Sequence, residues 1–204
     1  MDYYEAANRF WLMEESDKRS KEMNEMERFF LERTKKHIGR VKDFIEIVSE
    51  FYPASAAKLR GRGMMHDQSK YYIPERKPYI LLTWKYKMKK EGVDIEISDK
   101  DSERIREATF HHVKNNAHHP EYHDQTLKSN PINKGNREKR DKMADATAMD
   151  DLSITEMVCD WSAMSKENGE DSPRKWADES IKSRWKFSPK QQDFIYEIID
   201  LLWS

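Results

Sequence analysis

The chain has 204 residues, enough for one ordinary domain with a core of its own. Apolar residues make up 37% and charged residues another 37%, yet 6 Trp, 9 Tyr and 8 Phe can bury large areas, so the composition predicts a folded protein and excludes general disorder. The 37 Lys and Arg nearly balance the 38 Asp and Glu, which excludes a whole-protein field for non-specific binding to nucleic acid or anionic membranes.

The sequence carries no signal for export or membrane insertion. Its single cysteine, Cys159, excludes an intramolecular disulfide framework. Residues 1–17 are polar and lack both the basic region and the apolar run of a signal peptide. No apolar stretch approaches the roughly 20 residues that a membrane span needs. We therefore expect a cytoplasmic protein, in the host cytoplasm if the chain is viral, with no membrane partner.

The chain predicts an all-α fold. It has only 6 Gly and 7 Pro, and long stretches are rich in Glu, Lys, Arg, Met and Ala, which favour helix. Few segments alternate apolar and polar residues as a strand would. We expect a single-domain helical bundle with a helical N-terminal extension over 1–23, a core over 24–167 and C-terminal helices over 168–204 that pack on that core.

The first predicted helix is the clearest. It runs from about residue 24 to 51 and is closed by Pro53. Apolar residues and one histidine share a face at steps of three, four or seven: Phe30, His37, Val41, Phe44 and Val48. A second helix over 54–70 would place His66 and Lys70 on neighbouring turns. Two prolines, Pro74 and Pro78, then bracket a break before a third helix over 80–91.

The second half of the chain is expected to continue in the same way. A polar connection over 92–101 precedes a helix over 102–116, whose C-terminal end carries histidines. A surface loop over 123–136 precedes a helical region over 137–166. After a loop over 168–173, the pair Ser188-Pro189 predicts an N-cap followed by proline at the first position of the last helix.

Histidine is distributed unevenly along the chain. Five of the seven histidines fall within thirteen residues: His111, His112, His118, His119 and His123. The other two, His37 and His66, lie on upstream helices and face the expected core. Imidazole and carboxylate are usual ligands of Mn, Fe and Zn, and crossing helices can bring them to one point. The pattern predicts a metal site made by His37, the His66-Asp67 pair and a histidine of the cluster.

A further carboxylate would complete this site, and Asp160 is the best candidate. It lies one turn from Met157 and Met164 on an apolar helix face, where an ionised side chain requires a partner. Within the cluster we select His112, since it lies nearer than His111 to the apolar side of its helix. The histidines His118 and His119 follow the helix end, where they would complete a second metal site or contact a phosphoryl group.

Each of these residues also has a simpler interpretation. A histidine on an apolar face is more often a hydrogen-bonded core residue than a ligand. The clustered histidines would also suit a solvated surface patch. Two charged neighbours of the His-Asp pair, Lys70 and Glu75, would suit ordinary surface charges at a helix end. The case for a metal site therefore depends on these histidines and aspartates occurring together, and not on any one of them.

The order His37, His66-Asp67, a downstream histidine and Asp160 resembles the HD superfamily of metal-dependent phosphohydrolases over about residues 30–165. The string His66-Asp-Gln-Ser-Lys70 is similar to the His-Asp-x-Gly-Lys segment of cyclic-dinucleotide phosphodiesterases in that superfamily, with Ser69 in place of glycine. Three strings are more closely similar to an uncharacterised family of small HD-like proteins of bacteria and phages: His66-Asp-Gln-Ser-Lys70, His111-His-x-x-x-Asn-x-His118-His-Pro-Glu-Tyr122 and Met157-Val-Cys-Asp-Trp161. That family brings no established substrate.

The resemblance implies an HD-like core that binds one or two divalent transition-metal ions: Mn, Fe, Ni, Co or Zn. It implies that the metal ligands are His37, His66, Asp67, His112 and Asp160. The substrate would be a small phosphorylated molecule, a nucleotide or nucleotide-like compound. In this hypothesis Lys70 neutralises a phosphate oxygen, Glu75 acts as general acid or base, and the substrate contacts His111, His118 and His119.

Two other functions stay open at this point. Some HD-like proteins use the same ligands in a di-iron centre that activates dioxygen, so an oxygenase is the alternative enzyme. A non-catalytic protein that binds a nucleotide is the third possibility. The sequence carries no strong nucleic-acid signal and does not predict the oligomeric state.

Overall fold

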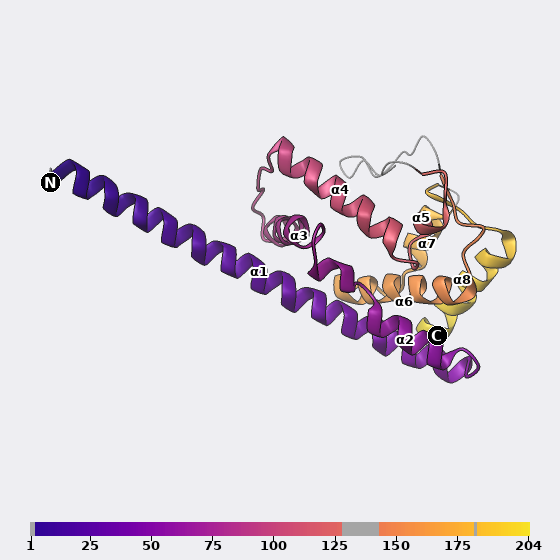
Figure 1. Ribbon diagram of the computed structural model, residues 1–204. Coiled ribbons are helices and arrows are strands. Elements are labelled where there is room, and N and C mark those ends of the chain that lie inside the picture. Colours follow the sequence, from indigo (N-terminus) through magenta and orange to yellow (C-terminus); the bar gives the residue numbers. More distant parts are fainter. Residues whose placement is uncertain (1–2, 128–142, 182) are drawn as a thin grey trace.

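The computed structural model describes residues 3–127, 143–181 and 183–204, and Figure 1 shows their arrangement. Within these ranges the fold has eight α-helices, one 3₁₀ helix and two short strands, which confirms the predicted all-α class. The helices are α1 (Tyr3–Phe51), α2 (Ala56–Met65), η1 (Gln68–Tyr71), α3 (Arg76–Lys90), α4 (Asp99–Asn115), α5 (Pro120–His123), α6 (Asp151–Asn168), α7 (Arg174–Ser180) and α8 (Pro189–Trp203). The strands are β1 (Ala144–Asp145) and β2 (Trp185–Lys186).

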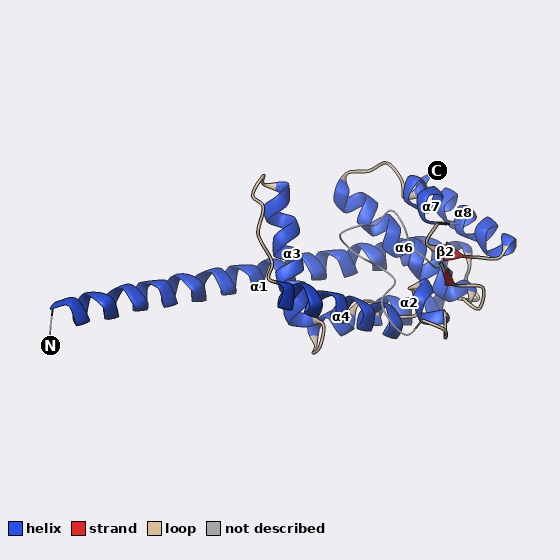
Figure 2. Cartoon of the chain, turned by 90° about the horizontal axis from the view of Figure 1, so that it is seen from above, coloured by secondary structure: helices blue, strands red, loops and turns tan. Residues whose placement is uncertain are grey.

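Helix α1 is the long axis of the molecule. It contacts α2, α3, α6 and α8, while its N-terminal part extends beyond the other helices (Figures 1 and 2). The expected helical extension over 1–23 is therefore, from Tyr3 onward, the beginning of α1 itself and no separate element. Residues 1 and 2 lie outside the described ranges.

The apolar core lies where α1, α2, α6 and α8 meet. Its fully buried members include Ile45 of α1, Leu59 of α2, Met157 of α6 and Ile195 of α8. Burial of one such side chain stabilises the fold by roughly 1.5–3 kcal/mol. The last helix begins as predicted, because Ser188 caps it and shares a capping box with Gln191. This core holds together α1 and α6, the helices that carry His37 and Asp160.

The expected second helix over 54–70 is wrong at its C-terminal end. Helix α2 ends at Met65, and His66 adopts an extended conformation with φ −53° and ψ 128°. The next residue, Asp67, has φ 58°, in the left-handed region that aspartate tolerates better than most residues. The chain turns there into η1, so Lys70 lies on η1 and not on α2. This turn directs the His-Asp pair toward the interior.

Helices α3 and α4 both begin earlier than predicted. Helix α3 starts at Arg76 and carries Pro78 in its first turn, where the missing N–H would have had no partner within the helix. Helix α4 starts at Asp99, because the Ser98 side chain accepts a hydrogen bond from the Asp101 backbone N–H at 3.1 Å.

The predicted helical region over 137–166 is correct only from Asp151. Its part over 143–150 is wrong, because β1 lies there and pairs in parallel with β2, Ala144 opposite Trp185. The Asp150 side chain then caps α6. Residues 137–142 of this prediction, and 128–136 of the predicted loop before it, lie outside the described ranges.

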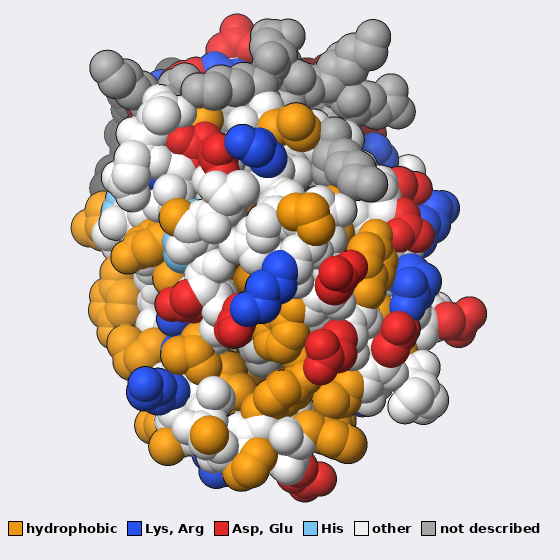
Figure 3. All heavy atoms as spheres, turned by 90° about the vertical axis from the view of Figure 1, so that its right-hand side faces the viewer, with side chains coloured by type: hydrophobic (Ala, Val, Ile, Leu, Met, Phe, Trp, Pro, Cys, Tyr) orange, Lys and Arg blue, Asp and Glu red, His pale blue; other side chains and the backbone are white. Residues whose placement is uncertain are grey.

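The molecular surface is mixed in character. Figure 3 shows the end where α8 and the C-terminal end of α1 lie, with hydrophobic side chains gathered over its lower part and charged ones scattered among them. Little histidine surface is visible on this face. Among the described helices, none combines the length and the apolar character needed to cross a membrane.

Candidate metal centre

Four parts of the fold bring their polar side chains to one buried place. Helix α1 supplies His37, the turn between α2 and η1 supplies His66 and Asp67, the last turn of α4 supplies His112, and α6 supplies Asp160. The structure thus brings together all five residues expected to bind metal. Four of them are buried, and the Asp160 side chain is 17% exposed.

The first group of ligand atoms surrounds one oxygen of Asp67. The Nε2 atom of His37 lies 3.0 Å from Asp160 Oδ1 and 3.5 Å from Asp67 Oδ2. The Nε2 atom of His66 lies 3.7 Å from Asp67 Oδ2 and 3.8 Å from Asp160 Oδ1. Two imidazoles and two carboxylates therefore face one another here.

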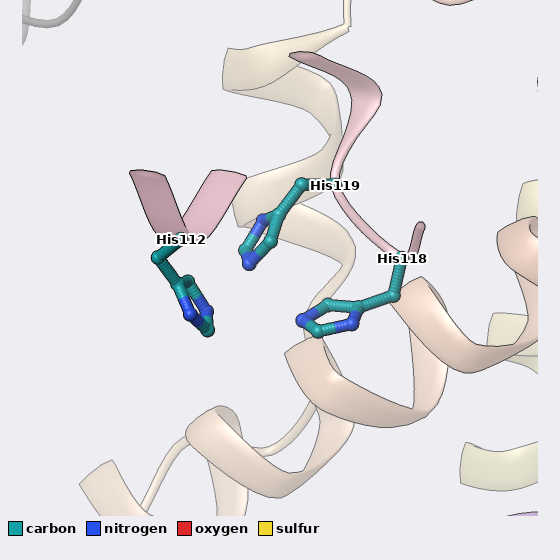
Figure 4. A group of neighbouring side chains, drawn as sticks. All are labelled: His112, His118 and His119. Atoms are coloured by element: carbon teal, nitrogen blue, oxygen red, sulfur yellow. The ribbon is translucent and has the colours of Figure 1, made fainter. Parts of the chain in front are cut away.

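The second group surrounds the other oxygen of Asp67. Its Oδ1 atom lies 3.2 Å from His112 Nε2 and 3.7 Å from His118 Nε2. Ligand atoms of His112, His118 and His119 lie within 4.8 Å of one another, and Figure 4 shows the three rings converging on one space. Asp67 thus lies between the two groups with one oxygen toward each.

Several of these atoms are buried without a hydrogen-bond partner among the described residues: Nε2 of His66, His118 and His119, and Oδ1 of Asp67. Buried polar atoms are rarely left unpaired, because each costs about 1–3 kcal/mol. Imidazole nitrogens and carboxylate oxygens are donors that Zn, Mn and Fe accept. The donor set therefore fits divalent transition-metal ions.

The charges around the site favour metal-binding protonation states at most positions. Burial would raise the pKa of Asp67, but Lys70 and His66 outweigh it and hold that pKa well below its ordinary value. Burial and the neighbouring His118 hold the pKa of His119 well below its ordinary value, so this imidazole is neutral. For His66 burial is outweighed by Asp67 and Glu156, which raise its pKa, so protons compete with metal there.

Glu156 is a buried residue of the site that the sequence analysis missed. Its Oε1 atom lies 2.9 Å from His66 Nδ1 and 3.2 Å from His118 Nδ1. Burial would raise the pKa of Glu156, but the hydrogen bonds of His118 and His66 outweigh it and lower that pKa. One signal was present in the sequence: Glu156 precedes Asp160 by four residues on one helix, so both share a face.

Glu75 does not have the surroundings of the expected general acid or base. It is fully buried, with Oε2 2.8 Å from His112 Nδ1 and Oε1 2.7 Å from His111 Nδ1. The Ser69 hydroxyl donates to the same Oε2 at 2.9 Å. Burial is outweighed by the hydrogen bond of His112, so the pKa of Glu75 is lowered and the group is an ionised acceptor. This geometry favours orientation of His112 over proton transfer.

The remaining expected residues divide between the interior and the rim. Lys70 forms an ion pair with Asp67 and lies over the Tyr79 ring, 5.5 Å from its centroid. His111 is at the rim, with its side chain 40% exposed. His118 and His119, for which a second metal site and a substrate contact were the two expectations, lie in the second ligand group. His123 lies apart, with Nε2 2.9 Å from the Ala117 carbonyl oxygen.

Comparison with known proteins gives a family and no function. No curated protein and no solved structure matches the chain. One protein family, described as a family of unknown function, matches residues 26–201, a range that contains every residue of the two ligand groups. The chain therefore belongs to this family, DUF5662.

Proposed function

We propose that this protein is an HD-type, metal-dependent phosphohydrolase that cleaves a phosphoester or phosphoanhydride bond of a nucleotide or nucleotide-like small molecule. One observation carries the proposal: a buried Asp67 lies between two groups of imidazoles. Nε2 of His66 in one group and Nε2 of His118 in the other lie near its carboxylate and have no hydrogen-bond partner among the described residues. Such an arrangement is suited to a pair of metal ions that share one carboxylate.

The chain divides its ligands between the two positions. One ion would be held by His37, His66 and Asp160, and the other by His112, His118 and His119, with Asp67 shared between them. When bound, divalent metal lowers the pKa of a water molecule to make a nucleophile and offsets negative charge at phosphorus.

The charge of the loaded site supports an anionic substrate. Two carboxylates, Asp67 and Asp160, lie in the ligand groups, and Glu75 and Glu156 contact the ligand histidines, so two divalent ions would offset the charge of all four. Lys70 adds a further cation beside Asp67. His111 at the exposed rim is placed to contact the rest of a substrate. A phosphoryl group complements this charge, and its oxygens suit Lys70 as a hydrogen-bond donor.

Elemental analysis of the purified protein tests the proposal first. The informative variant is Asp67→Asn, since asparagine has the same shape and also tolerates the left-handed backbone. The matched control is Asp43→Asn, on the exposed side of α1. We expect one or two equivalents of Mn, Fe, Ni, Co or Zn in the wild type and the control, and a large loss in Asp67→Asn.

A screen for the hydrolysis products of nucleotides and cyclic dinucleotides then tests the reaction. The products to detect are phosphate, pyrophosphate, nucleosides, nucleoside monophosphates and linear dinucleotides. Turnover that requires metal and disappears in Asp67→Asn would support the hydrolase. Wild-type protein that stays metal-free after reconstitution would overturn the proposal. Iron retention with oxygen consumption and no hydrolysis would overturn it in favour of a di-iron oxygenase, and tight nucleotide binding without turnover would favour a binding protein.

A further inference from the structure

One residue, Glu156, contacts a histidine of each ligand group. His66 of the first group and His118 of the second both turn Nδ1 toward the same oxygen of Glu156, at 2.9 and 3.2 Å. An ionised carboxylate only accepts hydrogen bonds, so each Nδ1 must donate its N–H. A single side chain on α6 therefore contacts two histidines that are 52 residues apart in the sequence.

This arrangement decides which nitrogen is free for a metal. A neutral imidazole carries one N–H, so a proton on Nδ1 leaves a lone pair on Nε2. In both histidines Nε2 is the buried atom without a partner among the described residues, and it lies 3.7 Å from an oxygen of the Asp67 carboxylate. The hydrogen bonds to Glu156 thus present both nitrogens in the form that a metal requires.

Arg62 fixes Glu156 in turn. Its Nε donates to Glu156 Oε2 at 2.7 Å, and its Nη2 donates to Ser153 Oγ at 3.0 Å. Glu156 could itself be considered a ligand beside His66 and His118, because their donor atoms lie close together. However, these atoms already satisfy one another, and the Arg62 guanidinium occupies the second carboxylate oxygen.

We propose that Glu156 is a positioning residue that sets the tautomer and orientation of His66 and His118 together, and so couples the two metal positions. This inference rests on the proposed metal centre. Glu75 provides the contrast, because it contacts His112 of the second group and the rim residue His111, and neither is in the first group. Loss of Glu156 should therefore weaken both ions, whereas loss of Glu75 should weaken one.

The test substitution is Glu156→Gln, with Glu167→Gln as the matched control. A glutamine amide cannot accept from Arg62 on one side and from both imidazoles on the other, because one side must present its NH₂ group. Glu167 lies on the same helix and accepts from Arg33 at 2.7 Å and Arg40 at 3.2 Å, but in the described structure it forms no hydrogen bond or ion pair with a residue of the ligand groups. Circular dichroism and thermal melting establish that each variant folds.

Two measurements then decide the inference. Competition with a chromophoric chelator gives the affinity for Zn²⁺, where we expect Glu156→Gln to weaken both binding events about 10- to 100-fold, Glu75→Gln to weaken one, and Glu167→Gln to weaken neither. Nitrogen-15 NMR of the metal-free wild type at alkaline pH should show His66 and His118 with the proton on Nδ1.

The outcomes separate the two proposals. A wild type that binds no Zn²⁺ overturns both the metal centre and the coupling. A wild type that binds two ions with the same affinities as Glu156→Gln overturns the coupling alone. An Nε2–H tautomer in the wild type also overturns it, and this result needs no variant.

Discussion

Metal should stabilise this fold, because it would satisfy buried atoms that have no partner among the described residues. Four ligand atoms, on His66, Asp67, His118 and His119, are buried without partners among the described residues, and each carries a cost of about 1–3 kcal/mol. An ion that satisfies them binds the folded chain in preference to the unfolded one. At a free metal concentration 100 times the dissociation constant, one ion adds about 2.7 kcal/mol to the free energy of unfolding.

That gain should be visible in thermal unfolding. A domain of this size moves by about 2–4 °C per kcal/mol, so one saturated position should raise the Tm by roughly 5–11 °C. The assay is circular dichroism of protein stripped with EDTA and then titrated separately with Mn, Fe, Ni, Co and Zn ions. We expect the control Asp43→Asn to follow the wild type and Asp67→Asn to show little shift. An equal shift in Asp67→Asn, or no wild-type shift with any of the five metals, would refute this reasoning.

Two further predictions concern pH and packing. The hydrogen-bonded histidines lower the pKa of Glu156 below its ordinary 4.5, and His37 lowers that of Asp160 below its ordinary 3.8, each against the effect of burial. The stability that these groups contribute is therefore fully present above those ordinary values, and it is lost as pH falls from them through the lowered pKa values of the folded state. Urea unfolding of the metal-free wild type below pH 4.5 should therefore show a steeper loss of stability than Glu156→Gln, and parallel curves would contradict this. In α2, Gly61→Ala should raise the free energy of unfolding by up to about 1 kcal/mol, because nothing lies within 4 Å of the added carbon. Gly63→Ala should raise it less, because its added carbon would lie 2.9 Å from Ile45 Cδ1. Equal increases for the two variants in urea titrations would contradict this packing.

Helical periodicity was sufficient to predict much of the site. It placed His37 on the buried face of α1 and His112 nearer the core than His111, and the structure agrees with both. Asp160 was found because an ionised group on an apolar face needs a partner. These predictions depend on which face of a helix a residue occupies, and local sequence encodes that property.

The missed features depend on contacts between distant segments. The role of Glu156 follows from two histidines that approach it from different parts of the chain, and periodicity cannot bring these together. The strand at Ala144 forms only because Trp185 supplies its partner from much later in the sequence. The end of α2 was misplaced because residues 66–70 follow a helical pattern, while the buried contacts of Asp67 favour a left-handed turn.

The left-handed backbone at Asp67 limits what evolution can place at the centre of the site. Most residues there would add roughly 1–2 kcal/mol of backbone strain to the loss of the proposed shared ligand. Glutamate would keep the charge, but its backbone would carry the same strain and its side chain is longer. Substitution by glutamate is therefore no low-cost step toward a different metal geometry. Asparagine and glycine alone escape the backbone cost. In a mutational scan that reports folding without metal, tolerance at position 67 should therefore be confined to aspartate, asparagine and glycine, a narrower set than at His112, which has an ordinary helical backbone.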